Sequence, residues 1–126
     1  MLFRSTDWDM ASWVPDVVVI NIGTNDIWTG GYSKDAYVDA YVEMVLEMTE
    51  IFGDRVSFFL CTSMMASNLD ASVQAVYEEL VIEHGVAAYY VDLPMQLNAG
   101  GHPTNASHVA AADVLYNEII ERVWVD

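Results

Sequence analysis

Three short apolar runs, each followed by a helix-like pattern, constrain the fold of this chain more than any other feature. They occupy residues 16–22 (DVVVINI), 56–62 (VSFFLCT) and 86–91 (VAAYYV). The first is mostly β-branched and does not alternate with polar residues, which is typical of a strand buried on both faces. Strands that alternate with helices pair in parallel through right-handed crossovers. The sequence therefore predicts an α/β layered sheet.

The segments after these runs have helical periodicity and recognisable ends. Ser33 is expected to cap a helix that ends at Gly53, because its apolar residues recur at steps of three and four. Asn68 is expected to cap a second helix that runs to Gly85, and a third spans about residues 106–123. No linker or low-complexity tract divides the chain. One domain over residues 1–126 is therefore expected.

Three parallel strands leave an apolar strand edge without a partner, because such sheets usually have about five or six strands. Residues 17–22 contain no lysine or proline that would block pairing with another strand. The segment before Pro15, with Phe3, Trp8 and Trp13, is expected to cover part of this edge. A second copy of the chain is expected to cover the rest, so the sequence predicts a homo-oligomer.

The charge of the chain excludes several classes of partner. It has 4 Lys+Arg against 19 Asp+Glu, a net charge of −15, and its cations are scattered singly. This charge repels phosphate backbones and anionic lipid headgroups, so neither nucleic acid nor a membrane is expected as a partner. No apolar run approaches the ~20 residues of a membrane helix. A neutral small-molecule substrate is expected, with no cofactor and no metal, since no tight ligand spacing occurs.

Cysteine usage and the first ten residues bear on localisation. Cys61 is the only cysteine and cannot form an intrachain disulfide, so it indicates no compartment. Residues 1–10 contain Arg4, Asp7 and Asp9 and lack the apolar core of a secretory signal. As given, the chain is expected to be cytoplasmic, or secreted if it is a processed or truncated product.

Polar residues follow each predicted strand, where ligands bind in open α/β sheets. Residues 23–26 (GTND) follow the first strand and Ser63 ends the second. His102 lies in the Gly/Pro/Asn-rich residues 92–105 that follow the third. Because the carboxyl ends of parallel strands share one edge, Asn25 and His102 are expected to face the same cleft.

These motifs resemble those of the SGNH (GDSL-type) hydrolases, and most of all carbohydrate esterase family 2. The resemblance rests on residues 18–26 (VVINIGTND), residues 100–104 (GGHPT), residues 13–16 (WVPD) and the spacing from His102 to His108. It covers essentially the whole chain but matches only the later part of the family's domain. It implies a truncated, flavodoxin-like three-layer α/β sandwich with about three parallel strands.

The resemblance also implies an esterase that removes short acyl groups, acetyl above all, from carbohydrates. Asn25 would be the oxyanion-hole asparagine, whose amide N–H stabilises the oxygen that becomes negative. His102 would be the general base. Gly23 would let the backbone turn sharply at the strand end. Asp26 would brace the loop or cap the following turn.

The chain departs from the family at the nucleophile. No Gly-Asp-Ser motif occurs in the sequence, and Ala99 stands where the family often has an aspartate three residues before the histidine. Ser63 is the best-placed replacement by topology, although serines at strand ends often bond local backbone. Further hydroxyls rank behind it: Thr104, Ser107 and Ser5. Alternatively, His102, or Asp26 with it, activates water directly.

Other interpretations of the same residues remain open. The competing function is a non-catalytic SGNH-fold fragment that acts as a binding or assembly module. Asn and Asp after a strand are also ordinary loop residues that bond the backbone. Trp28 is either a platform for a sugar ring or a lid over the sheet. His108 is interpreted as a residue of a helix's first turn and His84 as a cation at a helix C-terminus.

Overall fold

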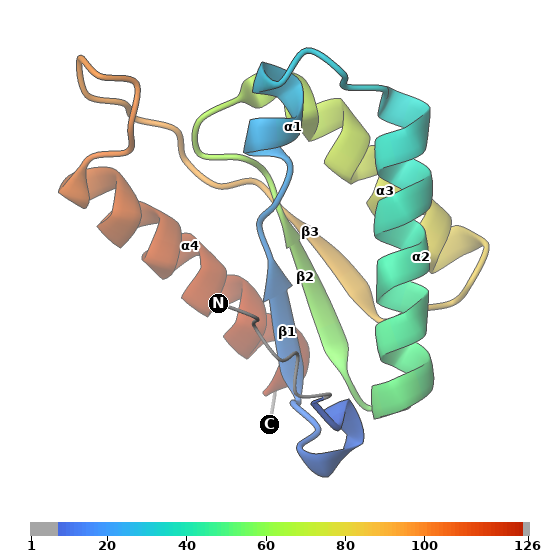
Figure 1. Ribbon diagram of the computed structural model, residues 1–126. Helices are drawn as coiled ribbons and strands as arrows, with labels where there is room; N and C mark the ends of the chain where they lie inside the picture. Colours follow the sequence, from blue (N-terminus) through green and yellow to red (C-terminus); the bar gives the residue numbers. More distant parts are fainter. Residues whose placement is uncertain (1–7, 125–126) are drawn as a thin grey trace, which may run out of the picture.

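The computed structural model describes residues 8–124, which form one parallel sheet with helices on both faces (Figure 1). The strands lie side by side in the order β1 (Val17–Ile20), β2 (Ser57–Cys61) and β3 (Ala88–Val91). Helices α2 (Lys34–Phe52) and α3 (Asp70–Ile82) cover one face, and α4 (Asn105–Val123) covers the other. The predicted three-layer α/β fold with three parallel strands is confirmed.

Helix ends agree with the sequence except at α3. Ser33 Oγ accepts a hydrogen bond from Ala36 N at 3.4 Å, and α2 ends at Gly53 as predicted. The prediction that Asn68 caps α3 is wrong, because Asn68 lies inside a short 3₁₀ turn, η2 (Ser67–Leu69). The residue before α3 is Leu69, and no side chain caps this helix.

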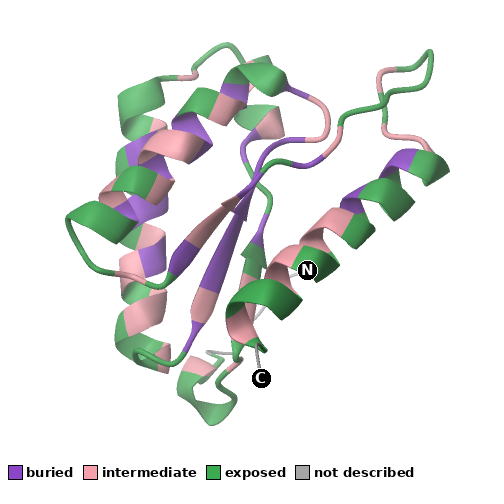
Figure 2. Cartoon of the chain, turned by 180° about the vertical axis from the view of Figure 1, so that it is seen from behind, coloured by how far each residue is buried: buried purple, intermediate pink, exposed green. Residues whose placement is uncertain are grey.

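The two faces of the sheet are packed unequally (Figure 2). The core between the sheet and helices α2 and α3 includes Val45, Phe58 and Leu80, all fully buried. The core under α4 is smaller and centres on Phe59 and Val91. Within α4 only two residues are buried, Ser107 and Ala111. The helix that follows the candidate histidine is therefore the less firmly packed one.

Strand β1 lies at the edge of the sheet. It pairs with β2 from Val17–Ser57 to Ile20–Leu60, and in the described part of the chain nothing pairs with its other side. Val19, in the middle of this strand, is 42% exposed. Trp8 and Trp13 are 76% and 71% exposed, so the expectation that they cover the edge is not met. Phe3 lies outside the described residues.

Candidate active site

The turn after β1 carries Asn25 on a five-residue helix, α1 (Thr24–Trp28). Gly23 makes this turn with φ at +105°, a conformation that L side chains rarely adopt. A Cβ atom at Gly23 would lie 2.6 Å from Tyr37 Cε2 and 3.1 Å from Leu69 Cδ1. Both the backbone and its neighbours therefore require glycine here, and Asn25 is left exposed on α1.

Side-chain hydrogen bonds tie the carboxyl ends of the three strands together. Asn21 Nδ2 donates to the carbonyl of Thr62 at 3.2 Å. Thr62 Oγ1 donates to Asp92 Oδ1 at 3.3 Å and accepts from Leu93 N at 2.8 Å. The roles of these residues were not predicted from the sequence. One feature of the sequence could have identified them: Asn21, Thr62 and Asp92 are polar residues at the ends of apolar runs.

Ser63 is buried in the same layer and holds α1 against the end of β2. Its Oγ lies 2.8 Å from Thr24 Oγ1 and accepts a hydrogen bond from Met65 N at 3.1 Å. The residue is 4% exposed. This is the local bonding expected of a serine at a strand end.

The other hydroxyls considered as nucleophiles belong to α4 or lie outside the described residues. Thr104 Oγ1 accepts from Ser107 N at 3.1 Å and so caps the helix. Ser107 is 1% exposed, and its hydroxyl donates to the carbonyl of Thr104. Ser5 lies outside residues 8–124.

His102 stands on a loop that is held together mainly by Asn98. The side-chain oxygen of Asn98 accepts from Gly100 N at 2.8 Å and from His102 N at 3.2 Å. The carbonyl of His102 accepts from Asn98 N at 2.8 Å, and Leu97 bridges to Pro103. The residue is exposed. In the described region, no hydrogen bond involves its ring.

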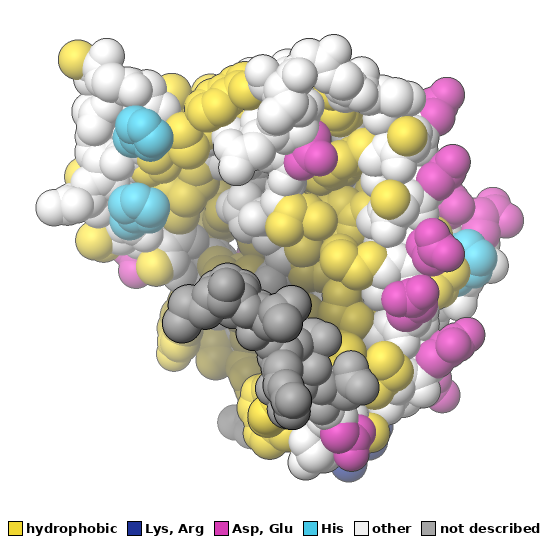
Figure 3. Space-filling model, viewed as in Figure 1, with side chains coloured by type: hydrophobic (Ala, Val, Ile, Leu, Met, Phe, Trp, Pro, Cys, Tyr) yellow, Lys and Arg dark blue, Asp and Glu magenta, His cyan; other side chains and the backbone are white. Residues whose placement is uncertain are grey.

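The structure brings Asn25 and His102 to the same end of the sheet. Figure 1 shows α1 and the loop before α4 both beyond the carboxyl ends of the strands, and Figure 3 shows two histidines over that loop and the start of α4. Among residues 8–124, no hydrogen bond joins the two residues, so a shared cleft stays a prediction. The Asp26 carboxylate likewise has no described hydrogen-bond partner. Its backbone N–H donates to the carbonyl of Gly23, and its carbonyl accepts from Thr29 Oγ1 at 3.1 Å.

Aromatic residues flank the Asn25 side of the site. Trp28, at the end of α1, is 59% exposed. Tyr37 Oη donates to the carbonyl of Ile22 at 3.2 Å. Burial, Tyr32 and Asp26 raise the pKa of Tyr37 to about 12, so its hydroxyl keeps its proton at neutral pH.

Within the described residues, no three His, Cys, Asp or Glu side chains are grouped so that they could hold a metal ion. The helices of the same region include none that is long and apolar enough to cross a membrane.

Comparison with known proteins places the chain beside carbohydrate esterases. It is 33% identical over 127 residues to the cellulase/esterase CelE of Acetivibrio thermocellus. A family two carbohydrate esterase from Clostridium thermocellum, solved in complex with cellohexaose, matches with a TM-score of 0.86 and 28% identity. A family two carbohydrate esterase from Cellvibrio japonicus matches with a TM-score of 0.80 and 20% identity, which shows a similar fold. No protein-family model matches the sequence.

These matches cover nearly all of this chain but only part of its relatives. The alignment with CelE takes in 93% of this chain and 16% of CelE. The alignment with the cellohexaose-bound esterase takes in 98% of this chain and 41% of that one. The chain is therefore a relative of the family two carbohydrate esterases, which are of the SGNH type, over a part of their length.

Proposed function

We propose that this chain hydrolyses short acyl esters, acetyl esters above all, on carbohydrates. The observation that carries the proposal is the position of Asn25 and His102 beyond the carboxyl ends of β1 and β3, at one end of the sheet. Ligand sites in open α/β sheets lie at this end. The likeness to carbohydrate esterases supports the choice of ester and sugar.

In this proposal His102 acts as the general base and Asn25 as the oxyanion donor. His102 takes a proton from the nucleophile as its oxygen bonds to the acyl carbon. The Asn25 amide N–H donates to the carbonyl oxygen as it becomes negative, an effect worth roughly 3–4 kcal/mol in other enzymes. The tetrahedral intermediate then breaks its bond to the sugar oxygen, which takes the proton from His102.

Water is the nucleophile that fits these residues. No Gly-Asp-Ser motif occurs among the 126 residues, and Ser63 is buried and bonded to Thr24 and Met65. Attack by water gives acetate and the free sugar hydroxyl in one addition and one elimination. A site without the nucleophilic serine lacks most of the rate acceleration of a catalytic triad. In other enzymes, removal of triad residues leaves a rate only ~10³–10⁴-fold above that of the reaction in water.

Trp28 supports a carbohydrate as the substrate. Its side chain is 59% exposed on the helix that carries Asn25, so an aromatic surface is free to contact a sugar ring. We assign it the role of a platform and expect the substitution Trp28→Ala to raise KM for an acetylated oligosaccharide more than for p-nitrophenyl acetate.

The direct test is the release of acetate from p-nitrophenyl acetate and from an acetylated oligosaccharide. His102→Ala is expected to remove nearly all of the activity. Asn25→Ala is expected to lower kcat by about 10²–10³-fold, the usual effect of losing one oxyanion donor. His84→Ala is the control, because His84 follows α3 on an exposed segment before β3, and it should leave the rate unchanged.

Ser63→Ala distinguishes the nucleophiles. With water as the nucleophile, this variant keeps part of its activity, although the loss of the Thr24–Ser63 bond loosens α1, and a serine-directed phosphonate does not inhibit the wild type. Loss of activity together with phosphonate labelling of residue 63 would assign the nucleophile to Ser63 instead. Activity that survives His102→Ala comes from a contaminating esterase. If the purified wild-type protein has no esterase activity, the chain is the non-catalytic binding or assembly module.

We also propose that the chain self-associates through β1. Val19 is exposed at an edge that has one described strand neighbour, and an edge of this kind is a template for pairing. Light scattering should therefore find a dimer or larger species, strengthened by salt because each copy carries −15. Val19→Lys should yield a monomer, whereas Val109→Lys, on the exposed face of α4, should not. A wild-type monomer would contradict the proposal.

A further inference from the structure

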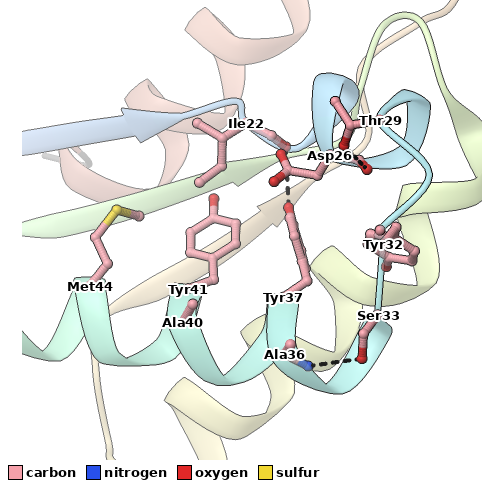
Figure 4. Close-up of a pocket in the computed structure, with 11 residues that line it drawn as sticks. Ile22, Asp26, Thr29, Tyr32, Ser33, Ala36, Tyr37, Ala40, Tyr41 and Met44 are labelled. Atoms are coloured by element: carbon pink, nitrogen blue, oxygen red, sulfur yellow. Dashed lines mark hydrogen bonds between the residues drawn. The ribbon is translucent and has the colours of Figure 1, made fainter.

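A cavity of about 390 Å³ lies between α1 and α2, beside the end of β1 (Figure 4). Its volume is within the range of small-molecule sites, about 300–1,000 Å³. Its walls include these residues: Ile22, Asp26, Tyr32, Tyr37, Tyr41 and Met44. Asn25, Ser63 and His102 are not among its lining residues. The proposed ester site therefore leaves this cavity without an assigned role.

Tyr41 contributes a buried polar atom that has no described partner. The residue is 3% exposed, and its Oη atom is buried with no hydrogen bond to any described residue. Figure 4 shows the hydroxyl pointing from α2 toward Ile22. An unpaired buried hydroxyl is unfavourable, because it has given up its hydrogen bonds to water without replacing them. A ligand with a hydrogen-bonding group would remove this penalty.

The pKa values keep the hydroxyls of the cavity neutral. Burial raises the pKa of Tyr41 well above its ordinary value, with smaller contributions from Tyr37 and Cys61. Tyr37 is also protonated at neutral pH, and its Oη is already bonded to the carbonyl of Ile22. Tyr41 therefore presents an O–H group that can still donate and accept a hydrogen bond.

Aromatic rings and one carboxylate give the cavity a preference for positive charge. The rings of Tyr37 and Tyr41 meet edge to face at 86°, with centroids 5.6 Å apart. The ring of Tyr32 is tilted by 56° against that of Tyr37. Asp26 adds a carboxylate, and the chain as a whole carries −15. Aromatic faces and a carboxylate in one pocket are the features that bind organic cations.

We propose that this cavity binds a small organic ammonium ion, a primary alkyl- or aralkylammonium. Its N–H groups donate to the Asp26 carboxylate and to Tyr41 Oη. Its apolar part packs against Ile22 and Met44. A neutral molecule of the same shape lacks the charge-assisted bond to Asp26, which is the stronger of the two.

The test compares 2-phenylethylammonium with 2-phenylethanol, which has nearly the same shape and no charge. Each is titrated into the full chain at neutral pH while amide NMR signals of residues 22–44 are followed. The ammonium ion is expected to bind several-fold more tightly than the alcohol, up to about 10-fold, because Asp26 is exposed and water screens part of its charge.

Two variants separate the contributions of Asp26 and Tyr41. Asp26→Asn should abolish the preference for the ammonium ion over the alcohol. Its control is Asp35→Asn, which removes the same charge from an exposed position outside the cavity lining and should keep the preference. Tyr41→Phe should weaken binding without lowering the stability of the free protein, because it removes a hydroxyl that has no described partner.

Equal affinity for the two compounds would overturn the proposal, and so would an equal effect of Asp26→Asn and Asp35→Asn. Loss of binding as the protein self-associates would show that a second copy occupies the cavity, which also overturns it. The result is separable from ester hydrolysis, because His102→Ala should bind the ammonium ion as the wild type does.

Discussion

The two candidate catalytic segments lie at the same end of the sheet but are held in different ways. Asn25 follows Gly23, which packs against Tyr37 and Leu69, and α1 is tied to β2 through the Thr24–Ser63 hydroxyl pair. The loop of His102 is held by hydrogen bonds to Asn98, inside the loop itself. α4, which follows it, buries only two residues.

The fold therefore fixes the two halves of the candidate site to different degrees. The segment that carries Asn25, the proposed oxyanion donor, is bonded to the end of β2 and packs on Tyr37 and Leu69. His102, the proposed base, is presented by a segment with few contacts to the core, and such segments open at low free energy. The position of His102 therefore depends on its loop, and substitutions in the two halves should differ in size and in what they disturb.

Gly23→Ala is expected to have the largest effect. The new Cβ would clash with Tyr37, and the positive φ adds strain, so the free energy of unfolding should fall by about 2–4 kcal/mol. Gly30→Ala is the control, because Gly30 also has a positive φ but has nothing within 4 Å of a Cβ. Gly30→Ala should lower the free energy of unfolding by about 1–2 kcal/mol. Urea unfolding measures both, and equal losses would contradict the packing argument.

Ser63→Ala should have an intermediate effect. It leaves the half-buried Thr24 hydroxyl and Met65 N–H without their partner, so the free energy of unfolding should fall by about 1–2 kcal/mol. Ser57→Ala, at the other end of β2, is the matched control and should stay within about 0.5 kcal/mol. A Ser63→Ala variant as stable as the Ser57→Ala control would show that α1 is not held by this bond.

Most of the fold could be predicted because its elements leave local signals in the sequence. Buried strands are continuous apolar runs, and amphipathic helices repeat apolar residues at steps of three and four, so β1 to β3, α2 and α4 all appear in the sequence. The helix α1 has five residues, too few for a period to be seen. The start of α3 was misplaced because Asn68 favours caps in general, whereas here a 3₁₀ turn precedes the helix.

The site was less predictable because its contacts join distant residues. Asn25 and His102 could be chosen from topology and from the resemblance, but Thr24 and Ser63 bond across 39 positions and leave no pattern in the sequence. The unpaired hydroxyl of Tyr41 is also invisible there, since Tyr41 occupies an ordinary apolar position of α2.

Asn98→Ala is expected to have the smallest effect on stability, and the effect should be confined to its own loop. It removes the acceptor for two exposed N–H groups, each bond contributing about 0.5–1.5 kcal/mol at most. Amide exchange should accelerate at Gly100 and His102, while exchange in β2 stays unchanged. Asn98→Asp keeps a side-chain acceptor and should restore protection. Global unfolding of the alanine variant would show that the loop is not self-contained.

If Asn25 and His102 act in one site, their side chains must lie within reach of each other. The most direct measurement is cross-linking of an Asn25→Cys/His102→Cys double variant with a short reagent that joins two thiols. Cys61 can stay, because it is 1% exposed and burial raises its pKa to about 11. We expect rapid intrachain cross-linking of positions 25 and 102, and much slower cross-linking of positions 25 and 84 in the control Asn25→Cys/His84→Cys. Cross-linking of positions 25 and 102 no faster than that of positions 25 and 84 would contradict it.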